Sequence, residues 1–315
     1  MALTLEQYAA YLDTRELPWP APPEVKRAKA RPHLARLPKV RAVLWNVYGT
    51  LLAVPGGALV FEHPQELLMQ VALDKTVQEF KMWGSMSRKP GEPATYLAQL
   101  YAQALLEERG VSVGGERYPE VVAERVWESI IKKLLQKDYK FDAGFFGSLN
   151  EFSRKVAYFF HAGLQSAVCY PGAAIALRHV KRQALAQGLL ADGQCFTELQ
   201  LRRGLAKQDD RPDQDDWLDA DLRILSSEVR ARKPSERLFR RALKALDLRG
   251  IEPNEVLHVG SRLPLDIIPA KKLGMRTALF AGDKASLQAS PEQLKEPAGR
   301  PDVLLTALEQ LTEVI

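Results

Sequence analysis

The residues that suggest chemistry stand at the ends of apolar runs. Residues 42–52 read Ala-Val-Leu-Trp-Asn-Val-Tyr-Gly-Thr-Leu-Leu, so Asn46 and Tyr48 follow an apolar stretch. Far downstream, a second apolar stretch leads to Ser261 and Asp266. An asparagine amide is neutral and a poor nucleophile, and Mg²⁺ prefers carboxylate ligands, of which this set holds one. Among Asn46, Tyr48, Ser261 and Asp266, only Asp266 is an acid, so these candidate site residues carry little charge.

The first segment resembles the first motif of the haloacid dehalogenase-like (HAD) hydrolases, an apolar strand followed by Asp-x-Asp-Gly-Thr-Leu. In that family the first Asp is the nucleophile and the second is the usual proton donor. These positions match Asn46 and Tyr48 here. The metal-independent dehalogenase branch has Asp-x-Tyr-Gly-Thr, which Tyr48 fits, but that branch also needs the missing nucleophile. Because loss of a nucleophile typically costs about 10⁴–10⁶ in rate, Asn46 argues against turnover.

The second HAD motif is a strand that ends in Ser or Thr, and its match here is Ala191-Asp192-Gly193. Ala191 replaces the hydroxyl residue, and Asp192 replaces the amide that usually follows. A carboxylate at this place would repel a phosphate dianion unless it were neutralised. We therefore expect Asp192 to cap the next helix and not to act in catalysis.

The third motif is represented by residues 226–234, Ser-Ser-Glu-Val-Arg-Ala-Arg-Lys-Pro, which resemble Ser-Glu-Glu-Val-Gly-x-x-Lys-Pro. Lys233 matches the family lysine that orients the nucleophile and binds negative substrate oxygens. Two interpretations of Lys233 stay open. It forms an ion pair with Asp266, or it binds a small anion such as phosphate or carboxylate together with the backbone amides of Gly49 and Thr50.

The fourth motif, Gly-Asp-x-x-x-x-Asp, holds Mg²⁺ in the phosphatase branch of the family. Its match is residues 260–266, in which Ser261 replaces the first Asp and Asp266 remains. The spacing indicates descent from a metal-dependent phosphatase-like protein. Because one acid survives of the four that the family uses, we expect no cofactor and regard a Mg²⁺ site as disfavoured.

The order of elements predicts an α/β protein with a Rossmann-like parallel sheet and an inserted all-helical cap. We expect residues 41–55 and 166–315 to form the core and residues 56–165 to form the cap. Apolar residues at helical spacing predict four cap helices, at 64–82, 95–108, 119–136 and 149–164. Strands are predicted at 42–46, 188–191, 222–226, 255–259, 276–280 and 301–305, and further helices at 4–13, 173–187, 195–206, 235–247 and 266–273.

Residues 1–40 are predicted to form an N-terminal arm. Four prolines between residues 18 and 23 favour an extended strap, and Leu17 and Trp19 indicate that it docks on the rest of the chain. Residues 25–41 contain seven basic residues and no acidic one. No aromatic residue is interleaved among them, so we expect a solvated or docked arm and not a nucleic-acid-binding one.

Composition bounds the remaining possibilities. The chain has 315 residues and 46% apolar content, with no apolar run long enough to span a membrane. We expect no secretory signal, and Cys169 and Cys195 suit a reducing, cytoplasmic setting. The histidines show no metal-ligand spacing, and His258 is interpreted as a core residue. The acidic residues between positions 209 and 221 are interpreted as a solvated loop.

Three functions remain open from the sequence. The first is a HAD-like pseudoenzyme that retains anion binding. The second is an active hydrolase, phosphatase- or dehalogenase-like, with a rearranged acid such as Asp192 or Asp266. The third is a binding or scaffold module that uses the basic arm, for which removal of residues 1–40 should abolish binding and preserve the fold. The sequence favours no oligomeric state.

Overall fold

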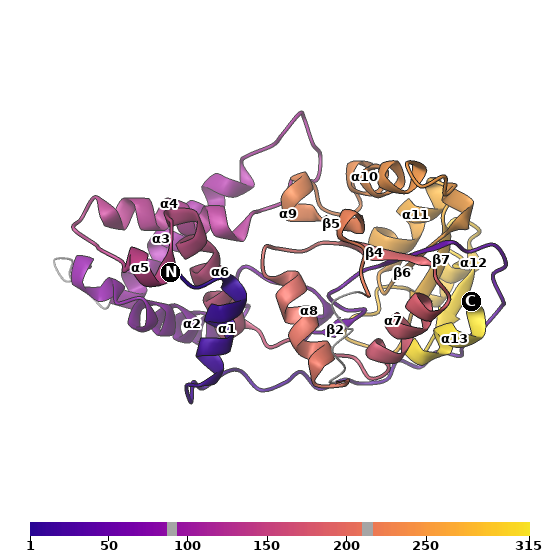
Figure 1. Cartoon of the computed structure of the whole chain (residues 1–315), viewed down its shortest axis with the longest axis horizontal. Coiled ribbons are helices and arrows are strands. Elements are labelled where there is room, and N and C mark those ends of the chain that lie inside the picture. Colours follow the sequence, from indigo (N-terminus) through magenta and orange to yellow (C-terminus); the bar gives the residue numbers. More distant parts are fainter. Residues whose placement is uncertain (87–92, 210–216) are drawn as a thin grey trace.

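The computed structural model describes residues 1–86, 93–209 and 217–315. Figure 1 shows two lobes, a helical one on the left and one built on a sheet on the right. The sheet has six strands in the order β5-β4-β1-β6-β7-β8, and every neighbouring pair is parallel. Their bounds are β1 Ala42–Trp45, β4 Ala186–Ala191, β5 Arg223–Leu225, β6 Val256–Gly260, β7 Arg276–Phe280 and β8 Val303–Leu305. The predicted Rossmann-like α/β core is confirmed.

Strand β1 lies in the interior of the sheet and is buried on both faces. Val43 and Trp45 pack into one apolar cluster, whereas Ala42 and Leu44 pack into another on the opposite face. This alternation follows from the two-residue period of a strand. The flanking helices are α7 Ala173–Arg182, α8 Thr197–Ala206, α9 Ser226–Val229, α10 Glu236–Asp247, α11 Ile268–Lys272, α12 Pro291–Lys295 and α13 Leu311–Val314.

Several predicted helix boundaries differ from the structure, and the end of the helix after residue 173 differs most. The helix expected over 173–187 ends at Arg182, and β4 already begins at Ala186. Ala184 between them has a φ of 54°, a left-handed conformation that cannot continue a right-handed helix. Gln187 then lies in the sheet. Its side-chain Oε1 accepts from Trp45 Nε1 at 3.0 Å, and its Nε2 donates to the Trp217 carbonyl at 2.6 Å.

The left lobe of Figure 1 is an all-helical cap. Its helices are α2 Glu66–Glu79, α3 Pro93–Arg109, α4 Ala123–Leu135, α5 Ala143–Phe146 and α6 Leu149–Leu164. The four long ones correspond to the four predicted from periodicity, and α5 was not predicted. Tyr101, Trp127 and Phe160 form the buried aromatic centre. The chain enters and leaves the cap through an antiparallel pair, β2 Leu52–Ala53 and β3 Val168–Cys169.

The N-terminal arm lies across both lobes. Helix α1, Leu5–Asp13, buries Tyr8, Ala9 and Leu12 in the cap core. Farther along, His33 forms a backbone bridge with Leu304 of β8. Since these residues complete the cap core, we expect removal of the arm to expose apolar surface and to destabilise the cap. The structure therefore argues against the expectation that the fold survives loss of residues 1–40, which stays a prediction.

The acidic loop is only partly covered by the described residues, because positions 210–216 lie outside them. Asp209 pairs with Arg178 at 2.5 Å, and Asp219 pairs with Arg249 at 2.5 Å. Across the described residues, no three His, Cys, Asp or Glu side chains are grouped so as to hold a metal ion. None of the helices in these parts of the chain is long and apolar enough to cross a membrane.

Candidate functional site

The four motif segments meet at the carboxyl ends of the central strands. Asn46 follows β1, Asp192 follows β4 and Ser261 follows β6, while Lys233 reaches in from the loop after α9. Strands β4 and β5 lie on one side of β1, whereas β6, β7 and β8 lie on the other, so the strand order reverses at β1. Such a switch point is where open parallel sheets bind ligands.

Lys233 is the centre of this site. Its Nζ lies 2.6 Å from Asp266 Oδ1, 3.1 Å from Asn46 Oδ1 and 3.4 Å from His258 Nε2. His258 Nδ1 lies 3.0 Å from the Leu44 carbonyl, to which only a protonated Nδ1 can donate, so Nε2 is left to accept from Lys233. The three ammonium protons therefore have three protein acceptors.

The charges at this centre are balanced internally. Burial would raise the pKa of Asp266, but the Lys233 ammonium and the Arg262 guanidinium hold it well below its usual range. Burial lowers the pKa of His258 to about 4, so its imidazole is neutral at pH 7. Lys233 and Asp266 have no exposed side-chain surface. Of the two interpretations of Lys233, the structure contains the ion pair.

Asn46 is held in one orientation by donors and acceptors on both sides. Its Nδ2 donates to the Tyr48 carbonyl at 2.8 Å and to Thr50 Oγ1 at 3.3 Å, while its Oδ1 faces Lys233. A carboxylate can accept hydrogen bonds but cannot donate them. The position is thus built around an amide, and an aspartate would place an oxygen against the Tyr48 carbonyl.

The backbone amides of Gly49 and Thr50, predicted to bind an anion, donate hydrogen bonds within their own turn. Gly49 N donates to the Leu52 carbonyl at 2.7 Å, and Thr50 N donates to the Val47 carbonyl at 3.1 Å. Each amide has one proton, so neither is left for a ligand. The anion cradle expected from Gly49, Thr50 and Lys233 is not formed.

Tyr48 points away from the Lys233 centre. Its hydroxyl donates to Gln200 Oε1 at 2.6 Å and lies 3.0 Å from Thr197 Oγ1, both on α8. Burial raises the pKa of Tyr48 above its ordinary value. The Tyr48 hydroxyl is therefore fixed to helix α8.

Asp192 does not cap a helix, contrary to the sequence prediction. Its Oδ1 accepts from the Lys233 backbone amide at 2.8 Å, and its Oδ2 pairs with Arg262 Nη2 at 3.0 Å. The neighbouring residues Ala191 and Gly193 supply no charged group, although Gly193 N donates to Ser226 Oγ at 2.9 Å. Asp192 is a structural acceptor that joins the second and fourth motif segments.

Arg262 is a central residue that the sequence analysis missed. Its backbone amide donates to Asp266 Oδ2 at 2.9 Å, and its guanidinium pairs with Asp192 and approaches Asp266 Oδ2 at 3.6 Å. The side chain is 7% exposed. The sequence did hold a signal for this role. Arg262 is a basic residue beside Ser261, in a segment that resembles an acidic metal motif.

The side chains present do not fit Mg²⁺. Asp266 is engaged by Lys233 and by the Arg262 amide, and the Asn46 oxygen is engaged by Lys233. Ser261 is fully buried, and its Oγ has no hydrogen-bond partner among the described residues. A hydroxyl brings no charge to offset that of a divalent ion. With cationic groups already on the one remaining carboxylate of the motif, the metal position is replaced by internal ion pairs.

A cavity of about 410 Å³ adjoins this centre between core and cap. Asp192 and Arg262 border it on the core side, and Phe61 and Glu120 border it on the cap side. Ser226 Oγ donates to Glu120 Oε2 at 2.6 Å. Burial raises the pKa of Glu120 to about 7.

The cap is fastened to the core next to this cavity. Gln194 donates to the Val121 carbonyl at 2.9 Å and accepts from the Ala123 amide at 2.9 Å. The Arg232 amide donates to the Tyr118 carbonyl at 2.9 Å. These contacts join the second and third motif segments to the cap, so an opening of the cap would have to break them.

Comparisons with known proteins agree with this fold. Residues 230–311 match the model of a family described as HAD-hydrolase-like. A glyceraldehyde 3-phosphate phosphatase of Pyrococcus furiosus is 32% identical over 148 residues, which cover 46% of this chain and 53% of that protein. The rhythmically expressed gene 2 protein of Drosophila melanogaster is 39% identical over 59 residues, covering 19% of this chain and 23% of that protein.

A solved structure extends the likeness to the whole fold. The 2-haloacid dehalogenase of Pseudomonas syringae pv. Tomato DC3000 has a TM-score of 0.53 and 16% identity, and the match covers 87% of this chain and 97% of that one. At this identity the likeness concerns the fold alone. The chain matches about half the length of the first curated relative and less of the second.

Proposed function

We propose that this chain is a haloacid dehalogenase-like protein whose hydrolase site no longer turns over. Its fold and motif order are those of a hydrolase. The groups that the reaction requires are replaced by neutral residues or consumed in internal contacts. We propose that the protein is kept for binding or regulation.

One observation carries this proposal. The Lys233 ammonium, which should meet the substrate's negative oxygens, has its three protons directed at Asp266, Asn46 and His258. A ligand that took one of these protons would leave a buried acceptor unsatisfied, at a cost of roughly 1–3 kcal/mol. The substrate's usual cationic contact is therefore unavailable without rearrangement of the site.

The cleft beside this centre supports retained binding of a small anion. Arg232 is exposed at its edge, and Arg262 lies deeper beside Asp192. An anion in this cleft would meet guanidinium groups in place of the Lys233 ammonium. Binding of this kind needs neither a nucleophile nor a metal ion.

A hydrolysis screen tests the proposal. The purified protein is offered phosphate monoesters with and without Mg²⁺, and 2-haloacids, with the Lys233→Ala variant as the background control. We expect no turnover above that control. Turnover that Lys233→Ala abolishes would overturn the proposal and favour the rearranged hydrolase, in which Asp192→Asn is the next variant to assay.

A second candidate function rests on the arm. Its seven basic side chains are exposed, and five of them have no ion-pair partner among the described residues, namely Arg27, Lys29, Arg31, Arg36 and Lys39. A surface of this kind can attract an acidic partner. Because truncation would damage the cap core, the suitable test is Arg27→Ser with Lys29→Ser and Arg31→Ser. The measurement is salt-sensitive retention on heparin. Retention that the triple variant does not reduce would show that the arm is not the binding surface.

A further inference from the structure

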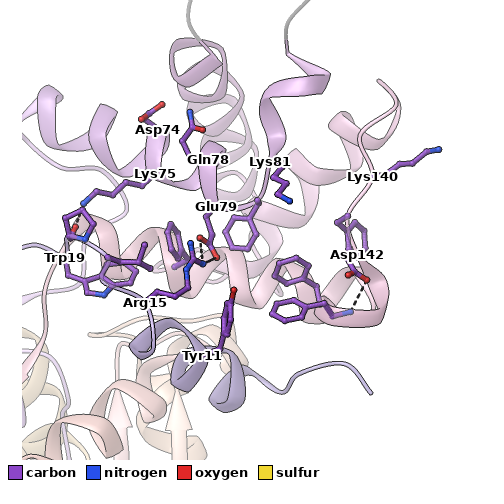
Figure 2. Close-up of a pocket in the computed structure, with 17 residues that line it drawn as sticks. Tyr11, Arg15, Trp19, Asp74, Lys75, Gln78, Glu79, Lys81, Lys140 and Asp142 are labelled. Atoms are coloured by element: carbon purple, nitrogen blue, oxygen red, sulfur yellow. Dashed lines mark hydrogen bonds and ion pairs between the residues drawn. The ribbon is translucent and has the colours of Figure 1, made fainter.

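A second cavity lies between the N-terminal arm and the cap, apart from the Lys233 centre. Its volume is about 660 Å³, within the usual range of about 300–1,000 Å³ for small-molecule sites. Figure 2 shows Tyr11, Arg15 and Trp19 of the arm on one side and residues of α2 on the other. No motif of the hydrolase fold contributes to it.

Arg15 of the arm and Glu79 of α2 form an ion pair at the base of this cavity. Arg15 Nη1 lies 2.7 Å from both carboxylate oxygens of Glu79, and Tyr8 donates to the same carboxylate at 3.1 Å. Lys75, at another edge, donates to the Pro18 carbonyl. These groups hold the arm against the cap.

The walls are aromatic. Phe80 and Phe146 have ring centroids 5.6 Å apart, Phe145 and Phe146 4.8 Å apart, and Tyr11 meets Phe145 edge-on at 5.4 Å. Trp19 meets Phe159 edge-on at 5.3 Å. Ring edges and faces presented at these angles suit the insertion of a further planar aromatic group.

Lys81 adds a positive charge to the lining of this cavity. It follows α2 with a φ of 51°, a left-handed conformation that glycine would adopt more readily. In Figure 2 its ammonium turns toward the space over the aromatic rings, whereas Lys140 points away from the cavity. Neither lysine has a hydrogen-bond or ion-pair partner among the described residues. The dipole of α2 favours a positive charge at this end of the helix. It does not require the Lys81 side chain to point toward the aromatic rings.

We propose that this cavity binds a planar aromatic molecule that carries a single negative charge, a carboxylate or a sulfonate. The ring system packs among Phe80, Phe145 and Phe146, and the acid group pairs with Lys81. Because Tyr11 and Trp19 of the arm form part of the wall, the bound molecule holds the arm on the cap. This inference does not depend on whether the hydrolase site is active.

Two matched probes and two matched lysines test it. The probes are 8-anilino-1-naphthalenesulfonate and its uncharged analogue N-phenyl-1-naphthylamine, titrated against the full-length protein by calorimetry and by quenching of tryptophan fluorescence. We expect the sulfonate to bind one to one and more tightly than the neutral analogue. Lys81→Ala should weaken binding of the sulfonate by about 3–10-fold and leave the affinity for the neutral probe unchanged. Lys140→Ala should change neither.

Further variants separate binding from folding. Lys81→Arg keeps the charge and should retain most of the affinity for the sulfonate. Circular dichroism should show that the lysine variants keep the native fold, because both side chains are exposed. Equal binding of the sulfonate by the Lys81→Ala and Lys140→Ala variants would overturn the proposal, as would tighter binding of the neutral probe.

Discussion

The Lys233 ammonium and the Asp266 carboxylate lie 2.6 Å apart, and neither side chain has exposed surface. Each is the main charge partner of the other in a region without solvent. Such a pair contributes little relative to apolar residues of the same size, but removal of one partner leaves a buried charge unbalanced. The pair therefore makes the centre intolerant of single changes.

We expect Lys233→Met to lower the free energy of unfolding by about 3–5 kcal/mol. The added change Asp266→Leu should restore part of the loss, because it removes the carboxylate that the first change leaves unpaired. Urea unfolding of the wild type, both single variants and the double variant measures the coupling. Additive losses would show that the two side chains do not interact.

Asn46→Asp alone is expected to give no measurable phosphatase or dehalogenase activity. Tyr48, Ala191 and Ser261 would still lack the family's groups, and the new carboxylate would face the Tyr48 carbonyl in place of the Asn46 Nδ2 donor. We expect a destabilisation of about 1–3 kcal/mol. Activity assays and urea unfolding are made on the same preparation, with Asn46→Ser as the uncharged control. Strong activity from this single change would show that the catalytic pocket is preserved.

Glu120 should make stability depend on pH near neutrality. Its pKa is raised by burial to about 7 in the folded protein, compared with about 4.3 in an unfolded chain. Between these values the folded state holds a proton that the unfolded state has released. Stability from this group is therefore fully present below about pH 4 and is lost as pH rises through about 7.

The Glu120→Gln variant tests this dependence. Its amide oxygen can still accept from Ser226 but does not titrate. As pH rises from 5 to 8, the free energy of unfolding of the variant should increase by about 1–3 kcal/mol relative to that of the wild type. Unfolding by urea at intervals of one pH unit measures the gain, and parallel curves for the two proteins would contradict it.

Helix α1 should be an integral part of the cap. Tyr8 is fully buried, so we expect Tyr8→Ala to destabilise the protein by about 3–5 kcal/mol, as for other large buried aromatic residues. Tyr11 on the same helix is 39% exposed and provides the control, for which we expect a clearly smaller loss. Thermal unfolding of both variants measures the difference. Equal losses would mean that α1 does not depend on Tyr8 for its docking.

The sequence by itself determined the parallel core, the helical cap and the segments that form the site. Strand β1 was predictable because a central strand that is buried on both faces must be apolar throughout. The cap helices were predictable because amphipathic spacing repeats within each helix. The amide at the position of the family's nucleophilic aspartate was also visible, since it depends only on the identity of Asn46.

Only the tertiary structure decided which partners the polar groups take. Lys233 and Asn46 are separated by 187 positions, and no local pattern fixes which acceptor an ammonium will meet. The same reason explains the wrong prediction for Asp192, whose partner Arg262 comes from another strand end. The backbone amides of Gly49 and Thr50 were expected to face a ligand, but the turn consumes them. Hydrogen-bond capacity is fixed by residue type, whereas its use depends on what folding brings within about 3 Å.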